Sequence, residues 1–297
     1  MLWHRACGGS LRWHNRVFTP GQTWEPNDHG SRLVWPGRGA LDARTIDTLP
    51  RLGHTVSILA SGPSVSRIRN LGRLFDHPVA CVNGSVSLAH ELGRRVAYFI
   101  VSDHRFILEQ PDLFRHGTAL ADAVVLTPMT AFTAMLLTPD ALAADALYIH
   151  DDLRRPFKRP RQRRAELLRD PQVIAHQSRD VCFSLDPRRG TWPSGTVVYD
   201  AIQLLFGIGY RELFMFGVDL SDEPRFYQEG AASPTQLTAD FAPAILPAFE
   251  LVHEYLRRTG CTLVNASLES RLPHEVIPKA DGDAVLDLLA GRRTPQP

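Results

Sequence analysis

The chain has 297 residues, of which 44% are hydrophobic and 22% charged, proportions that are ordinary for a folded globular protein. With 33 basic and 32 acidic residues the formal net charge is +1, which excludes a global field that attracts nucleic acid or membranes. No apolar run reaches about 18 residues and no apolar leader is present, so we expect neither a membrane-spanning helix nor a signal peptide.

The four cysteines, Cys7, Cys81, Cys182 and Cys261, are widely spaced and form no C-x-x-C pair of the kind that binds zinc or performs redox chemistry. Cys81 and Cys182 lie in short apolar stretches, which predicts reduced thiols in the core. Reduced cysteines are typical of a cytoplasmic protein.

Residues 1–50 are rich in Gly, Pro, Trp and Arg without clear periodicity, which predicts an irregular N-terminal arm or a few short strands. From residue 51 onward, short apolar runs alternate with helical patterns, so we expect one α/β domain over 51–297. The expected strands are TVSILA, VACVN, AYFIVS, AVVLT and ALYIH. The helical patterns VSRIRNLGRLF and VSLAHELG between them indicate a Rossmann-like, mostly parallel sheet with helices on both faces.

A turn of small residues, Ser61, Gly62, Pro63 and Ser64, follows the first predicted strand and precedes a predicted helix. Ligands of open parallel sheets bind beyond the carboxyl ends of the strands, where a helix N-terminus offers unpaired N–H groups to a phosphate. Gly62 allows close approach, so we expect a larger residue there to clash with a ligand and not with the core. The dinucleotide fingerprint and the Walker P-loop are both excluded by missing residues, and a plain turn without a ligand is the alternative.

A basic segment, residues 154–169, contains eight Lys or Arg residues in a nearly neutral protein. We interpret it as a docking surface for an anionic acceptor or for an anionic membrane, with Arg161, Arg163 and Arg164 as candidates. A solvated face is the alternative. Neither an interleaving of aromatic residues nor an RNA motif accompanies the basic residues, so we do not expect nucleic acid as a partner.

In the second half, the stretch 194–210 predicts a helix with Ser194 as its N-cap, followed by a buried strand that ends on Asp219. Residues 221–240 are polar, contain Pro and Gly and lack a pattern, which is typical of a lid loop. An amphipathic helix, a strand and a final helix are expected over 247–260, 261–267 and 283–291.

The ordered set LASGPS, CVNGS, SGTVVYDAIQLLFGIGYRELFMFGVDLS and LVNASLESRLP resembles small bacterial glycosyltransferases that use CMP-activated ulosonic acids. One branch is the single-domain CMP-sialyltransferases. The stretches GVDLSDEPRFYQEG and SRLPHEVIPK resemble more closely the lipopolysaccharide core Kdo-III transferases, which transfer the ulosonic acid Kdo. The resemblance extends from residue 55 to about 280.

The resemblance implies a metal-independent transfer of Kdo, or of a related ulosonic acid, from a CMP-sugar donor to an anionic lipopolysaccharide core sugar at the inner membrane surface, with no further cofactor. It assigns the CMP phosphate to Ser61–Ser64 and a donor contact to Asn83. Ser194, Gly195 and Thr196 match the second helix start, which contacts the donor sugar and the nucleotide, and Asp219 ends the strand before the lid.

The general base is left open by the sequence. The sialyltransferases carry a lid histidine as base, whereas residues 221–240 contain no histidine and offer Tyr227 and Glu229 instead. Closure of the lid would desolvate Glu229 and raise the pKa of its carboxyl. Asp103 and His104, at the end of a predicted strand, are the rival pair.

No metal site is expected. The pairs Asp219 with Asp222, Asp151 with Asp152 and Asp281 with Asp283 do not form a D-x-D site after a strand, and CMP has one phosphate only. Two predicted helix N-termini, at 62–65 and 194–197, would stabilise the departing CMP.

Two other functions stay open. One is a diphosphokinase similar to the archaeal hydroxymethylpterin enzymes, which would need ATP and Mg²⁺ with Asp103 and Asp219 as metal ligands. The other is a nucleotide- or glycan-binding protein without catalytic activity, which the missing lid histidine favours.

Overall fold

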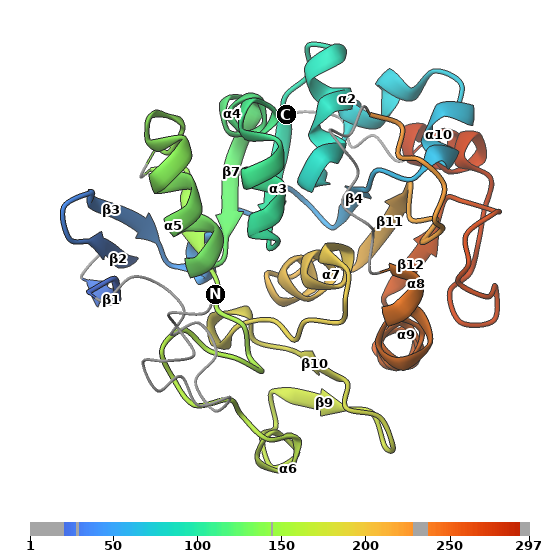
Figure 1. Ribbon diagram of the computed structural model, residues 1–297. Coiled ribbons are helices and arrows are strands. Elements are labelled where there is room, and N and C mark those ends of the chain that lie inside the picture. Colours follow the sequence, from blue (N-terminus) through green and yellow to red (C-terminus); the bar gives the residue numbers. More distant parts are fainter. Residues whose placement is uncertain (1–20, 28–29, 144, 228–236, 292–297) are drawn as a thin grey trace.

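One mixed sheet runs through the whole molecule (Figure 1). The computed structural model describes residues 21–27, 30–143, 145–227 and 237–291. Within these residues the strand order is β1 (Thr23–Asn27), β2 (Gly30–Trp35), β3 (Gly39–Arg44), β8 (Leu147–Ile149), β7 (Ala121–Leu126), β6 (Val96–Val101), β5 (Val79–Val82), β4 (Thr55–Leu59), β11 (Glu212–Phe216) and β12 (Thr262–Asn265).

All neighbours from β3 to β12 pair in parallel, which confirms the predicted α/β fold with a mostly parallel sheet. The chain moves outward from β4 to β8 and then returns to place β11 and β12 on the other side of β4. The strand order therefore reverses between β4 and β11. In open α/β sheets this switch point is where the carboxyl ends of the strands leave a crevice for a ligand.

The first three strands extend this sheet by antiparallel pairing, and β3 joins β8 through Arg44 and Tyr148. Residues 23–27 and 30–44 thus form a few short strands, which is one of the two alternatives that composition left open, while residues 1–20 lie outside the described part. Aromatic packing favours these strands, because Trp35 meets Phe132 of a covering helix edge to face with ring centroids 6.1 Å apart.

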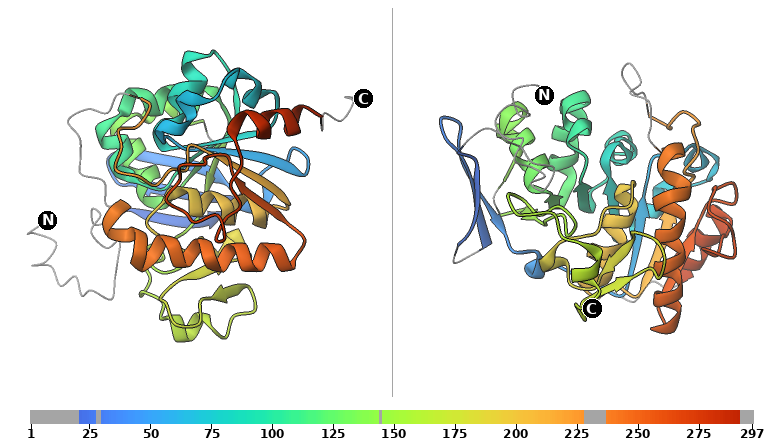
Figure 2. Two further views of the ribbon diagram at one scale, coloured as in Figure 1. Left: turned by 90° about the vertical axis from the view of Figure 1, so that its right-hand side faces the viewer. Right: turned by 60° about the horizontal axis from the view of Figure 1, so that its bottom comes forward.

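Helices cover both faces of the sheet, as Figure 2 shows from two sides. One face carries α2 (Val86–Glu91), α3 (His104–Glu109), α4 (Pro111–Leu120), α5 (Pro128–Leu137) and α10 (Gly282–Gly291). The other face carries α7 (Val197–Gly207) and α9 (Leu246–Arg258), beyond which lie α6 (Arg164–Leu167) and the hairpin β9 (Val173–Ala175) with β10 (Cys182–Ser184). A short helix, α8 (Leu237–Asp240), leads through a π-helical turn into α9.

Alternate residues of the strands supply two hydrophobic cores. In β6, Tyr98 and Ile100 pack with α7 and α9, whereas Phe99 and Val101 pack with α3 and α4. This alternation is the reason that the central strands read as continuous apolar runs. Cys81 and Cys182 are buried free thiols, as predicted.

The helix predicted over VSRIRNLGRLF is wrong. Two 3-10 segments, η2 (Pro63–Arg67) and η3 (Leu71–Asp76), replace it, because Asn70 between them adopts a left-handed conformation with φ 53°. A five-residue 3-10 segment aligns few peptide dipoles, so of the two helix N-termini predicted to stabilise the CMP only the one at α7 belongs to an α-helix. No helix in the described ranges is long and apolar enough to cross a membrane.

Candidate functional site

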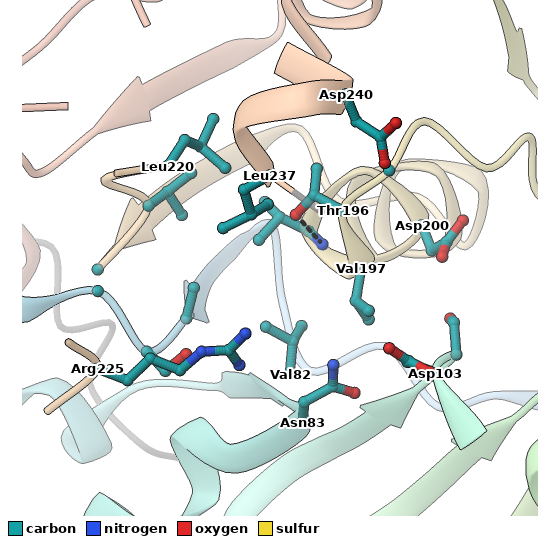
Figure 3. A pocket seen from close by; sticks show the side chains of 18 of the residues that line it. Val82, Asn83, Asp103, Thr196, Val197, Asp200, Leu220, Arg225, Leu237 and Asp240 are labelled. Atoms are coloured by element: carbon teal, nitrogen blue, oxygen red, sulfur yellow. Dashed lines mark hydrogen bonds between the residues drawn. The ribbon is translucent and has the colours of Figure 1, made fainter. Parts of the chain in front are cut away.

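An open cavity of about 1170 Å³ lies at the carboxyl ends of the strands around the switch point. Its walls come from residues 60–63, 82–83, 102, 103, 105, 127, 150, 152, 155, 191, 193–198, 200, 217–227, 237 and 240. Figure 3 shows Arg225 at one end, Asp103 and Asp200 at the other, and Asn83 and Thr196 between them. The volume is somewhat larger than the range of about 300–1,000 Å³ that is typical of sites for one small molecule.

The first turn is bound to Asp219, whose carboxylate accepts three hydrogen bonds. The backbone N–H and the hydroxyl of Ser64 donate to it over 2.8 and 2.6 Å, and the Ser267 hydroxyl donates over 2.6 Å. Asp219 thereby connects the ends of β4, β11 and β12. Ser61, Gly62 and Pro63 line the cavity, whereas the donors of Ser64 face this carboxylate.

The expected reason for glycine at position 62 is wrong. A Cβ there would lie closer than 3.0 Å to the carboxylate of Asp219 and to the carbonyl oxygen of Gly217. The close approach that glycine permits is therefore between two segments of the protein itself, and a larger residue would clash with the core.

Asn83 follows β5 and lines the cavity, as its predicted role requires. It has a left-handed backbone conformation with φ 47°, which Asn tolerates better than most residues. Its Oδ1 is buried and accepts no hydrogen bond from the described residues. A strained residue with an unpaired amide group in a cavity is characteristic of a ligand contact.

The start of α7 forms another wall through Ser194, Gly195 and Thr196, the three predicted residues. Thr196, and not Ser194, is the N-cap, because its side chain accepts from the Val198 N–H. The Ser194 hydroxyl is buried and unpaired within the described ranges. Gly195 has φ 85° and lies against the side chain of Asp240 in α8, so this carboxylate sits beside the positive end of the helix.

Two parts of the predicted lid are described. Residues 237–240 form the helix α8, and residues 221–227 are attached to the first turn and to the end of β5. The Phe226 N–H donates to the Ser61 carbonyl oxygen over 3.2 Å, and the Tyr227 ring lies against Gly84, where a Cβ would not fit. Arg225 donates to the Tyr227 hydroxyl over 3.1 Å and lines the cavity. Glu229, the predicted lid base, lies outside the described residues.

Of the rival pair, Asp103 lines the cavity, whereas His104 does not and is 37% exposed. The Asp103 carboxylate caps α3 and pairs with Arg105 at 2.7 Å. Burial alone would raise the pKa of Asp103, but the hydrogen bonds and charge of Arg105 outweigh it and hold the pKa below its ordinary value. A carboxylate paired in this way is a poor base.

Sequence reasoning missed the acidic end of the cavity, formed by His150, Asp152, Thr191 and Asp200. Burial raises the pKa of Asp200 to about 7, against the hydrogen bond from Thr191, and burial lowers the pKa of His150 to about 4. Burial also raises the pKa of Asp152. The signal was present for His150 and Asp152, which follow a predicted strand, but not for Asp200, which reads as an ordinary residue of a helix.

Among the described residues, no group of three or more His, Cys, Asp or Glu side chains is arranged to hold a metal ion.

The three arginines predicted to form the docking surface differ in their contacts with the rest of the protein. Arg161 pairs with Asp180 at 3.6 Å, Arg164 donates to the carbonyl oxygen of Gln177 at 2.8 Å, and Arg163 is exposed.

Fold and cavity together define a doubly wound α/β protein with an open cavity at its topological switch point. The chain belongs to the WaaZ family of 3-deoxy-D-manno-octulosonic acid (Kdo) transferases, whose family model matches residues 48–282. It is 24% identical over 253 residues to a probable 3-deoxy-manno-octulosonic acid transferase of Escherichia coli K12, covering 80% of this chain and 87% of that protein. A protein of the same description from Salmonella typhimurium LT2 is 24% identical over 240 residues, with 77% and 87% covered.

Solved structures with a related arrangement are more distant. The MAf glycosyltransferase of Magnetospirillum magneticum AMB-1 is 13% identical with a TM-score of 0.46, covering 81% of this chain and 36% of that one. The sialyltransferase CstII of Campylobacter jejuni, in complex with CMP-3FNeuAc, is 13% identical with a TM-score of 0.43, covering 78% and 88%. Family membership makes the chain a glycosyltransferase that transfers Kdo in lipopolysaccharide core synthesis, and it supports neither the diphosphokinase nor the non-catalytic binding protein.

Proposed function

We propose that the donor of this Kdo transferase is CMP-Kdo, that the cavity at the switch point binds it, and that transfer needs no metal ion. The observation that carries the proposal is a set of buried polar atoms in the cavity walls. Asn83 Oδ1, Ser194 Oγ and Ser221 Oγ all line the cavity, and each lacks a hydrogen-bond partner within the described part of the chain. Native proteins leave few such atoms unpaired, and a ligand with many hydroxyl and amino groups satisfies them.

The donor carries two negative charges, one on the CMP phosphate and one on the Kdo carboxylate. Arg225 at one end of the cavity and the N-terminus of α7 supply positive potential beside Asn83 and Thr196. As the bond to the leaving CMP breaks, negative charge grows on the phosphate. A guanidinium and a helix N-terminus stabilise that charge without a metal ion.

The acceptor is an anionic sugar of the lipopolysaccharide inner core, held where the enzyme meets the inner membrane. The basic segment supports this assignment, because Arg159, Arg163 and Arg169 are exposed. The helix α6 of the same segment lies on the same side of the sheet as α7 (Figure 1). Arg155 of the same segment lines the cavity. The segment thus extends from the site to the surface.

Calorimetric titration with CMP, CTP, ATP and NAD tests the donor. We expect CMP to bind with or without EDTA, and transfer from CMP-Kdo to lipopolysaccharide core to survive EDTA. Arg225→Gln should weaken CMP binding, because it removes the charge at the phosphate end of the cavity. Tyr227→Phe is the matched control, since it deletes the hydroxyl that accepts from Arg225 and keeps the guanidinium.

Binding of ATP alone, and only with Mg²⁺, would contradict the donor assignment and favour phosphoryl transfer. Loss of transfer in EDTA with recovery on adding Mg²⁺ would contradict the metal-free mechanism alone. Equal CMP affinity in Arg225→Gln and in the unmodified protein would remove Arg225 from the phosphate site.

A further inference from the structure

Asp200 occupies the end of the cavity that lies away from Arg225 (Figure 3). It belongs to the first turn of α7, is 6% exposed and lines the cavity. The surrounding wall comes from the ends of β6, β7 and β8, through Ser102, Thr127 and His150. The groups proposed for the donor lie around β4, β5 and the start of α7, so this end is left for the acceptor sugar.

Hydrogen bonds determine which atoms at this end can receive a proton. The Thr191 hydroxyl donates to Asp200 Oδ1 over 2.9 Å. His150 Nδ1 lies 3.3 Å from Thr191 Oγ1 and 3.3 Å from the carbonyl oxygen of Asp151. Because a carbonyl only accepts, Nδ1 carries the ring proton and Nε2 keeps its lone pair. Nε2 is buried, and nothing among the described residues donates to it.

We propose that Asp200 is the base that takes the proton of the acceptor hydroxyl, and that His150 Nε2 accepts a hydrogen bond from a neighbouring hydroxyl of the same sugar. The proposal rests on the proposed function. In the step, the acceptor oxygen bonds to the anomeric carbon of Kdo. The bond from that carbon to the phosphate oxygen breaks, its electron pair leaves with CMP, and the hydroxyl proton moves to Asp200.

Three other carboxylates in the cavity wall already accept hydrogen bonds within the protein. Asp219 accepts three hydrogen bonds, Asp103 caps α3 and pairs with Arg105, and Asp152 accepts from the backbone N–H groups of Arg154 and Arg155. Asp200 accepts its hydrogen bond from a hydroxyl at the edge of the cavity.

The surroundings of Asp200 suit a base that works near neutral pH. Its pKa of about 7 results from burial, and the nearby charge of Asp152 acts in the same direction. His150 and Asp152 from the loop after β8, with Asp103 and Arg105 from the β6 end and Arg155, are the other titratable or charged groups that line this end of the cavity.

Asp200→Asn tests the assignment in transfer from CMP-Kdo to lipopolysaccharide core. We expect kcat to fall about 10²–10⁴-fold, the typical cost of losing a general base, with donor affinity retained and the acid limb of the pH profile absent. Asp151→Asn is the matched control. Asp151 has an equally raised pKa of about 7 through burial but does not line the cavity, so its variant should keep kcat.

Thr191 is a positioning residue. Substitutions of Thr191 should therefore shift the pH profile of transfer that Asp200 determines. Thr191→Val removes a hydrogen bond to the charged carboxylate, so the acid limb should move to higher pH, and Thr191→Ser should restore it. Nearly unchanged kcat in Asp200→Asn, with loss in Glu229→Gln or His104→Asn, would overturn the role of Asp200 alone. Absence of turnover from CMP-Kdo by the unmodified enzyme would overturn the proposed function, and this proposal with it.

Discussion

Gly62 illustrates how a residue type that suggests ligand binding can instead serve the fold. The turn after β4 lies against Gly217 and Asp219, and Gly62 donates its N–H to the Gly217 carbonyl oxygen over 2.8 Å. This contact brings the ends of β4 and β11 together at the switch point. Because the ends of these two strands form walls of the cavity, the shape of the cavity depends on glycine at position 62.

Gly62→Ala should lower the free energy of unfolding by about 1–3 kcal/mol, the usual cost of overpacking a tight contact, because Asp219 and backbone atoms must move. Urea denaturation measures the change. Gly72→Ala is the control, since a Cβ at Gly72 would meet nothing within 4 Å. Equal free energies of unfolding for the two variants would show that the turn accommodates a side chain at position 62, against the prediction.

Among the elements of the fold, the basic segment, residues 154–169, contains two groups of arginines with different roles. Arg154 and Arg161 pair with Asp180, and Arg164 donates to carbonyl oxygens of the loop between β9 and β10. These arginines hold the hairpin in place. The exposed arginines, Arg159, Arg163 and Arg169, are left to face solvent or an anionic partner.

Binding to vesicles of anionic lipid or lipopolysaccharide should weaken steeply from low to physiological salt, where the Debye length falls to about 8 Å. The double reversal Arg159→Glu and Arg163→Glu should abolish it and leave CMP affinity unchanged. A reversal at Arg257 and Arg258, at the end of α9, is the control. Vesicle binding that ignores both salt and these substitutions would make the segment a solvated face.

For the whole molecule, the buried acids make stability depend on pH. Burial raises the pKa values of Asp151 and Asp200 to about 7 from the ordinary 3.8, so the folded state holds these protons more tightly than the unfolded state. Their contribution is fully present below about pH 4 and is lost as the pH rises towards 7. His150, with its pKa lowered to about 4 by burial, contributes stability that is lost as the pH falls from about 6.5 towards 4.

Asp151→Asn isolates one of these contributions, because an amide imitates the protonated acid and does not titrate. Relative to the unmodified protein, the variant should be stabilised more at about pH 8 than at about pH 5, by on the order of 1.4 kcal/mol for each pH unit between pH 5 and the folded-state pKa of about 7. Urea denaturation at both pH values measures the difference. A difference between Asp151→Asn and the unmodified protein that is equal at both pH values would contradict the raised pKa of Asp151.

Much of the sheet could be predicted from the sequence because its central strands are buried on both faces. The runs that became β4 to β8 are short and mostly apolar, and their length, their Val and Ile content and the turn residues beside them favour buried parallel strands. Residues 23–44 lacked that pattern, and only their pairing with β8 and packing against α5 made them strands.

The ordered motifs of the sequence determined the family, the α/β class, and the placing of Asn83 and Ser194–Thr196 in one site, because the carboxyl ends of parallel strands share one edge. Only the tertiary structure decided that Ser64 donates hydrogen bonds to Asp219, that the first turn is a 3-10 segment, and that Asp200 lines the cavity. The physical reason is that burial and hydrogen-bond partners arise from contacts between segments far apart in the chain. The pKa of a carboxylate depends on these neighbours, and the position of the carboxylate in the sequence does not reveal which neighbours it has.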